Sequence, residues 1–214
     1  MTNEQNIIHL DIFDEEAVTL IKRQRIKHLA FSFKFSCSLT QKKPFDLVQL
    51  LQFNDILEKL SLHGCNYSNL EKMFNEMPKL TYLDVDTQKI DFSLINKNST
   101  IESLHSEGTK TKEWNDITKL NSLKDLYING NIALENIDFL LGLNNLEKLR
   151  LYNCSKITSV PDLSNLKKLK WVSMEICNRL EDISELKKLE GVEIHVSGKM
   201  IKGGYHCSTR NNVL

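Results

Sequence analysis

A leucine pattern that occurs twice in the middle of the chain constrains its fold more than any other feature. Residues 123–131 read LKDLYINGN and residues 146–154 read LEKLRLYNC, so both segments fit L-x-x-L-x-L-x-x-N/C. Apolar and polar residues alternate within each segment, as they do in a strand that buries one face. Similar segments begin at Ile7, Ile26, Leu57, Leu80, Ile101, Leu169 and Leu189. From Leu57 onward the starts are 20 to 23 residues apart, which predicts a repeated unit of strand and connector.

The ninth position of each segment supports this register independently. It holds Cys65, Gln88, Thr109, Asn131, Cys154, Cys177 and Ser197. Cys154 and Cys177 are 23 residues apart, which is one repeat length. We expect these side chains to point inward and to hydrogen-bond backbone groups at the turn after each strand. Because three of the five cysteines serve the fold in this way, no disulfide framework is expected, and a reducing compartment is favoured.

This pattern resembles that of leucine-rich-repeat proteins, and the connectors ITSVPDLSNLKK and LEDISELKK resemble the short bacterial repeats of internalins. The resemblance covers residues 57–196 well and residues 7–56 loosely. It implies an α/β solenoid, a leucine-rich-repeat horseshoe with a parallel β-sheet on the concave face and short helices or 3-10 turns on the convex face. We expect one continuous domain, with an N-terminal cap and irregular first repeats at 1–56, repeats at 57–196, and a C-terminal cap and tail at 197–214.

Local signals predict details of the connectors. Ser68 and Glu71 have capping-box spacing, which predicts a helix that starts at Ser68 and stops at Pro78. Pro44 is expected to open a helix that continues through Phe53. In the repeat that begins at Ile101, Ser106 stands where an inward leucine belongs, so we expect Trp114 and Ile117 to supply the missing bulk.

The two ends of the chain depart from the pattern. The alternation of Phe31, Phe33 and Phe35 predicts a strand longer than those of the other repeats. The segment from Ile7 is interpreted either as a cap strand or as a true repeat. A small cap is expected after His195, because a solenoid must cover its terminal hydrophobic faces.

The third, fifth and seventh positions of each segment should point outward and line up across neighbouring repeats. Eleven of these residues form the predicted partner-binding face: Tyr82, Asp84, Asp86, His105, Glu107, Asp125, Tyr127, Arg150, Tyr152, Trp171 and Glu175. Outward Tyr, Trp and Arg are the residue types that supply most interface hot spots. The acidic members of the set favour a partner with a basic patch. The alternative is that the aromatic side chains only cover their neighbours on a solvated sheet.

Charge and hydropathy exclude several classes of partner. The chain has 28 basic and 28 acidic residues, and this balance favours neither nucleic acid nor an anionic membrane. No segment approaches about 18 consecutive apolar residues. The start of the chain, MTNEQNIIHLDIFDEE, lacks the basic and apolar regions of a signal peptide. These features predict a cytoplasmic protein. The small size, single domain and richness in Lys, Asn and Ile suit a bacterial protein, and we expect a monomer when unbound.

Enzyme, metal and cofactor motifs are missing from the sequence. It contains no G-x-x-x-x-G-K-[ST], G-x-G-x-x-G, G-x-S-x-G, H-E-x-x-H or C-x-x-C pattern. His9 and His28 occupy the same position of consecutive segments, but Lys59 stands where a third ligand would be needed. We therefore expect no catalysis, no metal and no cofactor.

The resemblance specifies fold far better than function. Leucine-rich-repeat proteins mostly act as protein-binding scaffolds, which implies a non-catalytic protein–protein interaction module that binds through the concave face. One alternative is a bacterial immunity protein that neutralises a cognate toxin by blocking its active site. A second alternative is a carbohydrate-binding module that uses the same aromatic residues.

Overall fold

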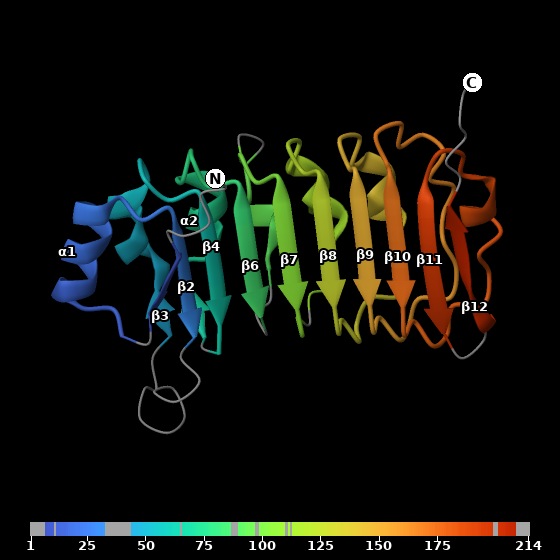
Figure 1. The fold of residues 1–214 in the computed structure, drawn as a ribbon, viewed down its shortest axis with the longest axis horizontal. Helices are drawn as coiled ribbons and strands as arrows, with labels where there is room; N and C mark the ends of the chain where they lie inside the picture. Colours follow the sequence, from blue (N-terminus) through green and yellow to red (C-terminus); the bar gives the residue numbers. More distant parts are fainter. Residues whose placement is uncertain are drawn as a thin grey trace.

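A computed structural model describes residues 7–10, 12–32, 44–64, 66–86, 90–96, 99–109, 111 and 113–198, and the backbone of 201–208. Within these ranges, strands from successive repeats form a ten-stranded sheet that runs the length of the molecule (Figure 1). Its order is β1 (Ile7–Leu10), β2 (His28–Ser32), β4 (Lys59–His63), β6 (Tyr82–Asp86), β7 (Ser103–Glu107), β8 (Asp125–Asn129), β9 (Lys148–Tyr152), β10 (Trp171–Glu175), β11 (Glu193–Gly198) and β12 (Ile201–Ser208). The first nine of these are parallel, and β12 pairs antiparallel with β11. The predicted α/β solenoid is confirmed.

Inward residues of the strands form the core, as their period-two alternation predicts. Leu126, Ile128, Leu149 and Leu151 are each at most 1% exposed. Burying a leucine or isoleucine side chain stabilises the fold by roughly 1.5–3 kcal/mol relative to leaving it in water. Because parallel pairing sets these residues side by side on adjacent strands, the core continues from one repeat to the next.

The ninth-position side chains lie inside the turns after the strands. The Asn131 amide donates to the Thr111 carbonyl oxygen at 2.8 Å, and its own oxygen accepts from the Ala133 amide at 2.9 Å. The Cys154 and Cys177 thiols are fully buried and contact the carbonyl oxygens of Ile128 and Leu151 at 3.7 and 3.8 Å. The predicted inward positions of Asn131, Cys154 and Cys177 are confirmed. Cys65 and Gln88 lie outside the described residues.

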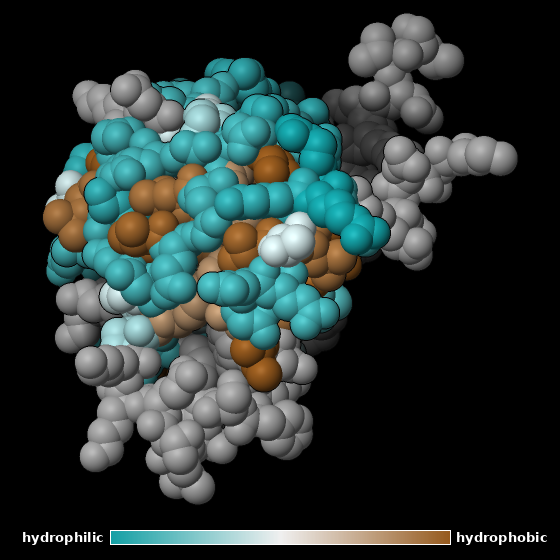
Figure 2. Space-filling view, turned by 90° about the vertical axis from the view of Figure 1, so that its left-hand side faces the viewer, coloured by the Kyte–Doolittle hydropathy of each residue, from teal (hydrophilic) through white to brown (hydrophobic). Residues whose placement is uncertain are grey.

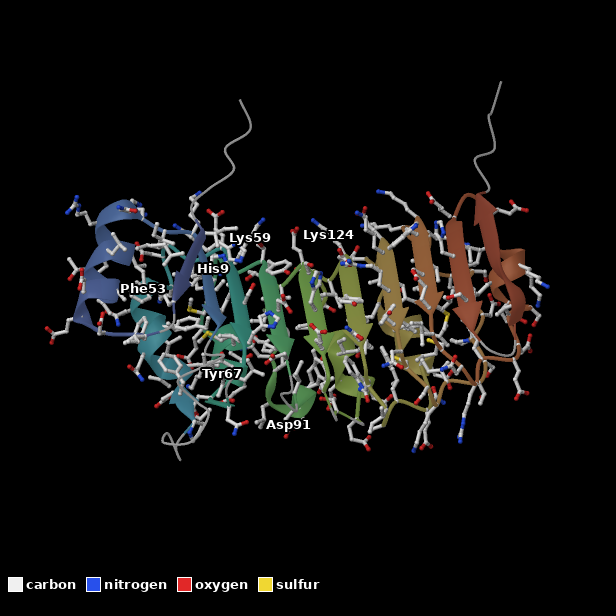
Figure 3. The ribbon with its side chains drawn as sticks, turned by 60° about the horizontal axis from the view of Figure 1, so that its bottom comes forward. His9, Phe53, Lys59, Tyr67, Asp91 and Lys124 are labelled. Atoms are coloured by element: carbon white, nitrogen blue, oxygen red, sulfur yellow. The ribbon has the colours of Figure 1, made fainter. Side chains whose placement is uncertain are left out.

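Short helical turns cover the side of the sheet opposite the outward strand residues. They are η1 (Leu47–Phe53), α2 (Glu71–Asn75), η2 (Phe92–Leu94), η3 (Asn115–Lys119), η4 (Asp138–Gly142) and η5 (Leu186–Lys188). Trp114 and Ile117 are buried there as expected, and the Trp114 ring lies 5.2 Å from Phe92 and 5.5 Å from Phe139 between centroids. Figure 3 shows Tyr67 and Asp91 on this side of the molecule.

Two of the local helix predictions are wrong in their starting points. Residues 45–46 form β3 (Phe45–Asp46), and the helix after them begins at Leu47, where the Asp46 carboxylate caps the Val48 amide at 3.1 Å. Ser68 belongs to β5 (Tyr67–Ser68), which pairs with β3, and its side chain does not cap the helix that follows. Helix α2 instead begins at Glu71 without a side-chain cap. In both places, residues that the local signals assigned to a helix form a short strand instead.

The N-terminal end contains a helix that the repeat pattern did not predict. Helix α1 (Glu15–Gln24) is capped by Asp14, whose carboxylate accepts from the Ala17 amide at 2.9 Å. It buries Ala17 and Ile21 against the first repeats. Strand β1 lies at the edge of the sheet, parallel to β2. The predicted long strand through Phe33 and Phe35 falls outside the described residues.

Both ends of the sheet are shifted by two residues from the predicted register. Ile7 lies opposite His28, so His9 faces Ala30 and the proposed pairing of His9 with His28 is wrong. At the other end Glu193 lies opposite Trp171, which moves Ser197 from the inward ninth position to the outward seventh. A shift of two residues keeps every side chain on its predicted face, so His9 and His195 still point outward.

Figure 2 looks onto the N-terminal end of the solenoid. Hydrophobic residues are visible there but are divided by hydrophilic side chains. Ile12 and Val48 are among the exposed apolar residues of this part of the chain, at 66% and 41%. None of the helices in the described ranges has the length and apolarity needed to cross a membrane.

Candidate functional site

Strand register arranges the outward side chains of β4 to β10 in three columns, which together we call the sheet face. The first column is Lys59, Tyr82, Ser103, Asp125, Lys148 and Trp171. The middle column is Ser61, Asp84, His105, Tyr127, Arg150 and Ser173. The third column is His63, Asp86, Glu107, Asn129, Tyr152 and Glu175.

All eleven residues of the predicted partner-binding face lie in these columns. Tyr82, Asp125 and Trp171 are in the first column. Asp84, His105, Tyr127 and Arg150 are in the middle column. Asp86, Glu107, Tyr152 and Glu175 are in the third column. Their side chains are partly or fully accessible, because the connectors cross behind the sheet.

His63 joins two of the predicted acidic residues. Its Nε2 lies 3.0 Å from a carboxylate oxygen of Asp84, and its Nδ1 lies 3.6 Å from Asp86. Asp86 also accepts the Gly64 backbone amide at 3.0 Å. Hydrogen bonds to Asp84 and then to Asp86 raise the pKa of His63 to about 10, so the imidazole is charged at neutral pH. One positive charge therefore faces two carboxylates, so their negative charge is offset only in part.

A chain of hydrogen bonds continues from Asp84 across β6 and β7. The Tyr82 hydroxyl donates to Asp84 at 3.4 Å and lies 3.1 Å from Nδ1 of His105. Burial, followed by the nearby charge of Arg150, lowers the pKa of His105 and keeps the imidazole neutral. Since Nε2 of His105 accepts from Arg150 at 2.9 Å, Nδ1 carries the proton and donates to the Tyr82 oxygen. Burial and the charge of Asp84 raise the pKa of Tyr82.

Arg150 is the junction of the middle column. Its Nη2 lies 3.1 Å from both carboxylate oxygens of Asp125 and 2.9 Å from His105. Its Cζ lies 4.8 Å from the centroid of the Tyr127 ring, in cation–π geometry. The Tyr127 ring also meets His105 edge-on at 5.5 Å. These contacts hold the aromatic side chains in fixed orientations before any partner arrives.

At the C-terminal end of the face the contacts are more local. Trp171 lies 5.7 Å from His195 between ring centroids, and His195 contacts Glu193 at 2.7 Å. The Ser173 hydroxyl donates to Glu175 at 2.6 Å. In the same way the Asn129 amide donates to Glu107 at 2.8 Å. Glu107 and Glu175 thus accept hydrogen bonds from neutral side chains.

Sequence reasoning identified the carboxylates but missed their internal partners. His63, Asn129 and Ser173, which contact the predicted carboxylates, were not among the predicted site residues. The signal that could have found His63 is its column, since it stands one repeat before Asp86 and diagonal to Asp84. Among the described residues no group of three or more His, Cys, Asp or Glu side chains could hold a metal ion.

The chain is similar to known proteins in its structure, but no known family or curated protein matches its sequence. No protein-family model matches the chain, and a search of curated proteins finds no match. Among solved structures, it is similar to an internalin (inlF) from Listeria monocytogenes, with 16% identity and a TM-score of 0.55 over 81% of this chain. That match covers 55% of the internalin chain. The chain is also similar to the leucine-rich repeat domain of the type III effector XCV3220 (XopL), with 17% identity and a TM-score of 0.58, over 88% of this chain and 74% of that domain.

Proposed function

The chain is a leucine-rich-repeat solenoid, a fold that typically forms non-catalytic interaction modules, and we propose that it binds a protein partner through the sheet face. The observation that supports this most directly is the joining of Tyr82, His105, Tyr127 and Arg150 by side-chain contacts on the exposed side of the sheet. An arrangement fixed in advance loses little conformational entropy on binding.

The size of the face fits a protein ligand better than a small molecule. Neighbouring parallel strands lie about 4.8 Å apart, so the six strands of the sheet face span roughly 24 Å and the whole ten-stranded sheet extends on the order of 40 Å. That length accommodates a standard interface of about 800 Å² per partner. The face is open, and small-molecule sites are usually concave pockets that enclose most of the ligand.

The charge pattern narrows the kind of partner. His63 offsets one of the two charges of Asp84 and Asp86, and Arg150 offsets the charge of Asp125. Among the described residues, Glu107 and Glu175 are the carboxylates of the predicted site without an ion-pair partner, and they accept hydrogen bonds from neutral side chains. We therefore assign the preference for a basic partner to the third column rather than to the whole acidic set.

A pull-down with two variants tests this proposal. The first variant replaces Tyr82, Tyr127 and Trp171 with alanine, and the control replaces Leu94 and Leu141, which are exposed at 56% and 43% on η2 and η4. Wild type and the control should capture the same protein from a lysate of the source organism, and the first variant should lose it. Circular dichroism must show that all three proteins are folded. Retention by the first variant and loss by the control would place the site on the opposite side.

A further inference from the structure

The eighth position of the repeats has the same unusual backbone conformation wherever the structure describes it between β4 and β10. The φ angles there are positive: 81° at Gly64, 58° at Gly108, 66° at Gly130, 53° at Asn153 and 55° at Ile176. Glycine adopts this left-handed conformation without steric cost, and asparagine tolerates it. Isoleucine is branched at Cβ and clashes with its own backbone there, so Ile176 is a strained exception in the series.

Packing does not compensate for the strain at Ile176. Its side chain is 40% exposed and lies outside the hydrophobic core cluster. The next residue, Cys177, is fully buried and holds the turn in place. A glycine at position 176 would therefore satisfy the fold better than isoleucine does. Strained residues that the fold does not require are concentrated at binding and catalytic sites.

A second exposed side chain with apolar surface, Tyr152, lies on the preceding repeat, one residue before the position that corresponds to Ile176. Tyr152 lies opposite Glu175 in the sheet and is 37% exposed. The Asn153 amide donates to the Glu175 carbonyl oxygen at 2.8 Å, so the chain after β9 runs beside the chain that leads into Ile176. Tyr152 and Ile176 thus stand on adjacent repeats at the carboxyl ends of their strands, and we call them the anchor pair.

The surroundings of the anchor pair are negatively charged. Neither Glu107 nor Glu175 has an ion-pair partner in the part of the chain that the structure describes. After burial, the charge of Glu107 contributes to raising the pKa of Tyr127, and Glu175 adds to it. The third column contains no lysine or arginine between β4 and β10. The anchor pair is therefore two exposed apolar side chains on the same part of the sheet as two carboxylates that have no ion-pair partner among the described residues.

We propose that the anchor pair, Tyr152 and Ile176, with Glu107 and Glu175, is the docking point for a protein segment that presents an apolar side chain flanked by lysine or arginine. The inference rests on the proposed protein-binding function and adds its chemical specificity. The apolar side chain of the partner covers Tyr152 and Ile176, and its cationic groups pair with the two glutamates. Burial of Ile176 by the partner provides the compensation that the free fold lacks.

Selection from a displayed library of random peptides tests the proposal on the full-length chain. Wild type should enrich peptides with an apolar residue next to Lys or Arg. A synthetic peptide of that composition should bind at least about tenfold more weakly to Ile176→Gly and to the Glu107→Gln/Glu175→Gln variant. Asn153→Gly is the matched control, because it has the same backbone conformation without an apolar side chain, and its affinity should stay within about twofold of wild type.

Unfolding midpoints separate a binding role of Ile176 from a structural one. Ile176→Gly should unfold at the same or a higher denaturant concentration than wild type, because it relieves the strain. A lower midpoint together with weaker binding would show that Ile176 serves the fold, and would overturn the proposal. Failure to enrich basic, apolar peptides would also overturn it.

The peptide experiment also distinguishes this inference from the wider proposed function. If the Tyr82/Tyr127/Trp171 alanine variant loses the enriched peptides while Ile176→Gly keeps them, the sheet face binds proteins but the anchor pair does not. If Ile176→Gly loses them and the triple variant keeps them, the docking point is supported and the wider face is not required.

Discussion

The guanidinium of Arg150 lies over the ring of Tyr127, 4.8 Å from its centroid, while its Nη2 contacts both carboxylate oxygens of Asp125 at 3.1 Å. One side chain therefore connects three strands, because Asp125 and Tyr127 are on β8 and Nη2 also reaches His105 on β7 at 2.9 Å. The aromatic residue Tyr127 and the charged residues Asp125 and Arg150 of the sheet face are thus parts of one network of contacts. A substitution of one residue in this network should therefore change a measurable property of its neighbours.

Replacing Arg150 with methionine should raise the pKa of His105. The charge of Arg150 is the second cause, after burial, of the lowered pKa of this imidazole. Methionine retains much of the side-chain volume but removes the charge. Titration of the His105 ring by NMR would measure the shift, with Lys148→Met as a control on the same strand. An unchanged pKa would mean that Arg150 does not occupy the position beside His105 in solution.

Ser106→Ala should stabilise the protein by about 1 kcal/mol. The Ser106 hydroxyl is buried and has no hydrogen-bond partner among the described residues. A buried polar group without a partner costs roughly 1–3 kcal/mol, and alanine removes that cost while leaving a cavity of only one atom. Urea denaturation would measure the change in the free energy of unfolding.

Ser173→Ala is the control for that prediction. Ser173 is also buried, but its hydroxyl donates to Glu175 at 2.6 Å. The same substitution should therefore give no gain there. Equal effects at the two positions would show that the Ser106 hydroxyl finds a partner in solution.

The outward columns were predictable from the sequence because one physical rule determines them. Side chains of a strand alternate with period two, so fixing Leu123 and Leu146 assigns every neighbour to a face. This is why Tyr82 and Glu175, almost a hundred residues apart, could be placed on one surface without coordinates. It is also why His195 remained outward although its repeat is shifted by two residues.

The features that the sequence did not predict depend on contacts between segments that lie far apart in the chain. The sequence placed Asp84 among the acidic residues that favour a basic partner, whereas its carboxylate contacts His63 of the preceding repeat. Ser68 satisfied a helix-cap pattern, but pairing of β5 with β3 used it in a strand. Helix α1 has local signals at Asp14 and Lys22, yet it was overlooked because it lies inside an interval treated as a repeat connector. The partner of a side chain on a neighbouring strand can be identified only from the three-dimensional structure. The same holds for the outcome where two local signals compete for one segment.

The buried thiols of Cys154 and Cys177 should resist alkylation in the native protein. Burial raises the pKa of the Cys154 thiol to about 12 and also raises that of Cys177, so neither forms the reactive thiolate at pH 8. Site-resolved mass spectrometry after iodoacetamide treatment should show labelling of both only at urea concentrations that unfold the chain. Rapid labelling without urea would contradict the inward positions.

Stability should fall between pH 6.5 and pH 10 in a way that depends on His63. The unfolded imidazole has a pKa of about 6.5, and Asp84 and Asp86 raise the folded value to about 10. A raised pKa gives stabilisation that is complete below pH 6.5 and is lost as pH rises through 10. His63 and the two carboxylates are partly exposed, so their contribution to stability should be on the order of 1 kcal/mol after screening by solvent. Urea unfolding of wild type and His63→Gln should show curves that converge near pH 10, and a constant difference would contradict the assignment.

The assignment of residues to the two faces of β8 can be tested with neighbouring substitutions. Leu126 is fully buried, so Leu126→Asp places an unpaired charge in the core and should unfold the domain. Tyr127 points outward beneath Arg150, and Tyr127→Ala should cost only about 1 kcal/mol, which is the order of a cation–π contact. The second variant should nevertheless lose affinity for the partner, because its aromatic surface is gone. Thermal melts of both proteins give the comparison directly. Similar losses of stability would mean that β8 is rotated by one residue, with Asp125, Tyr127 and Asn129 pointing inward.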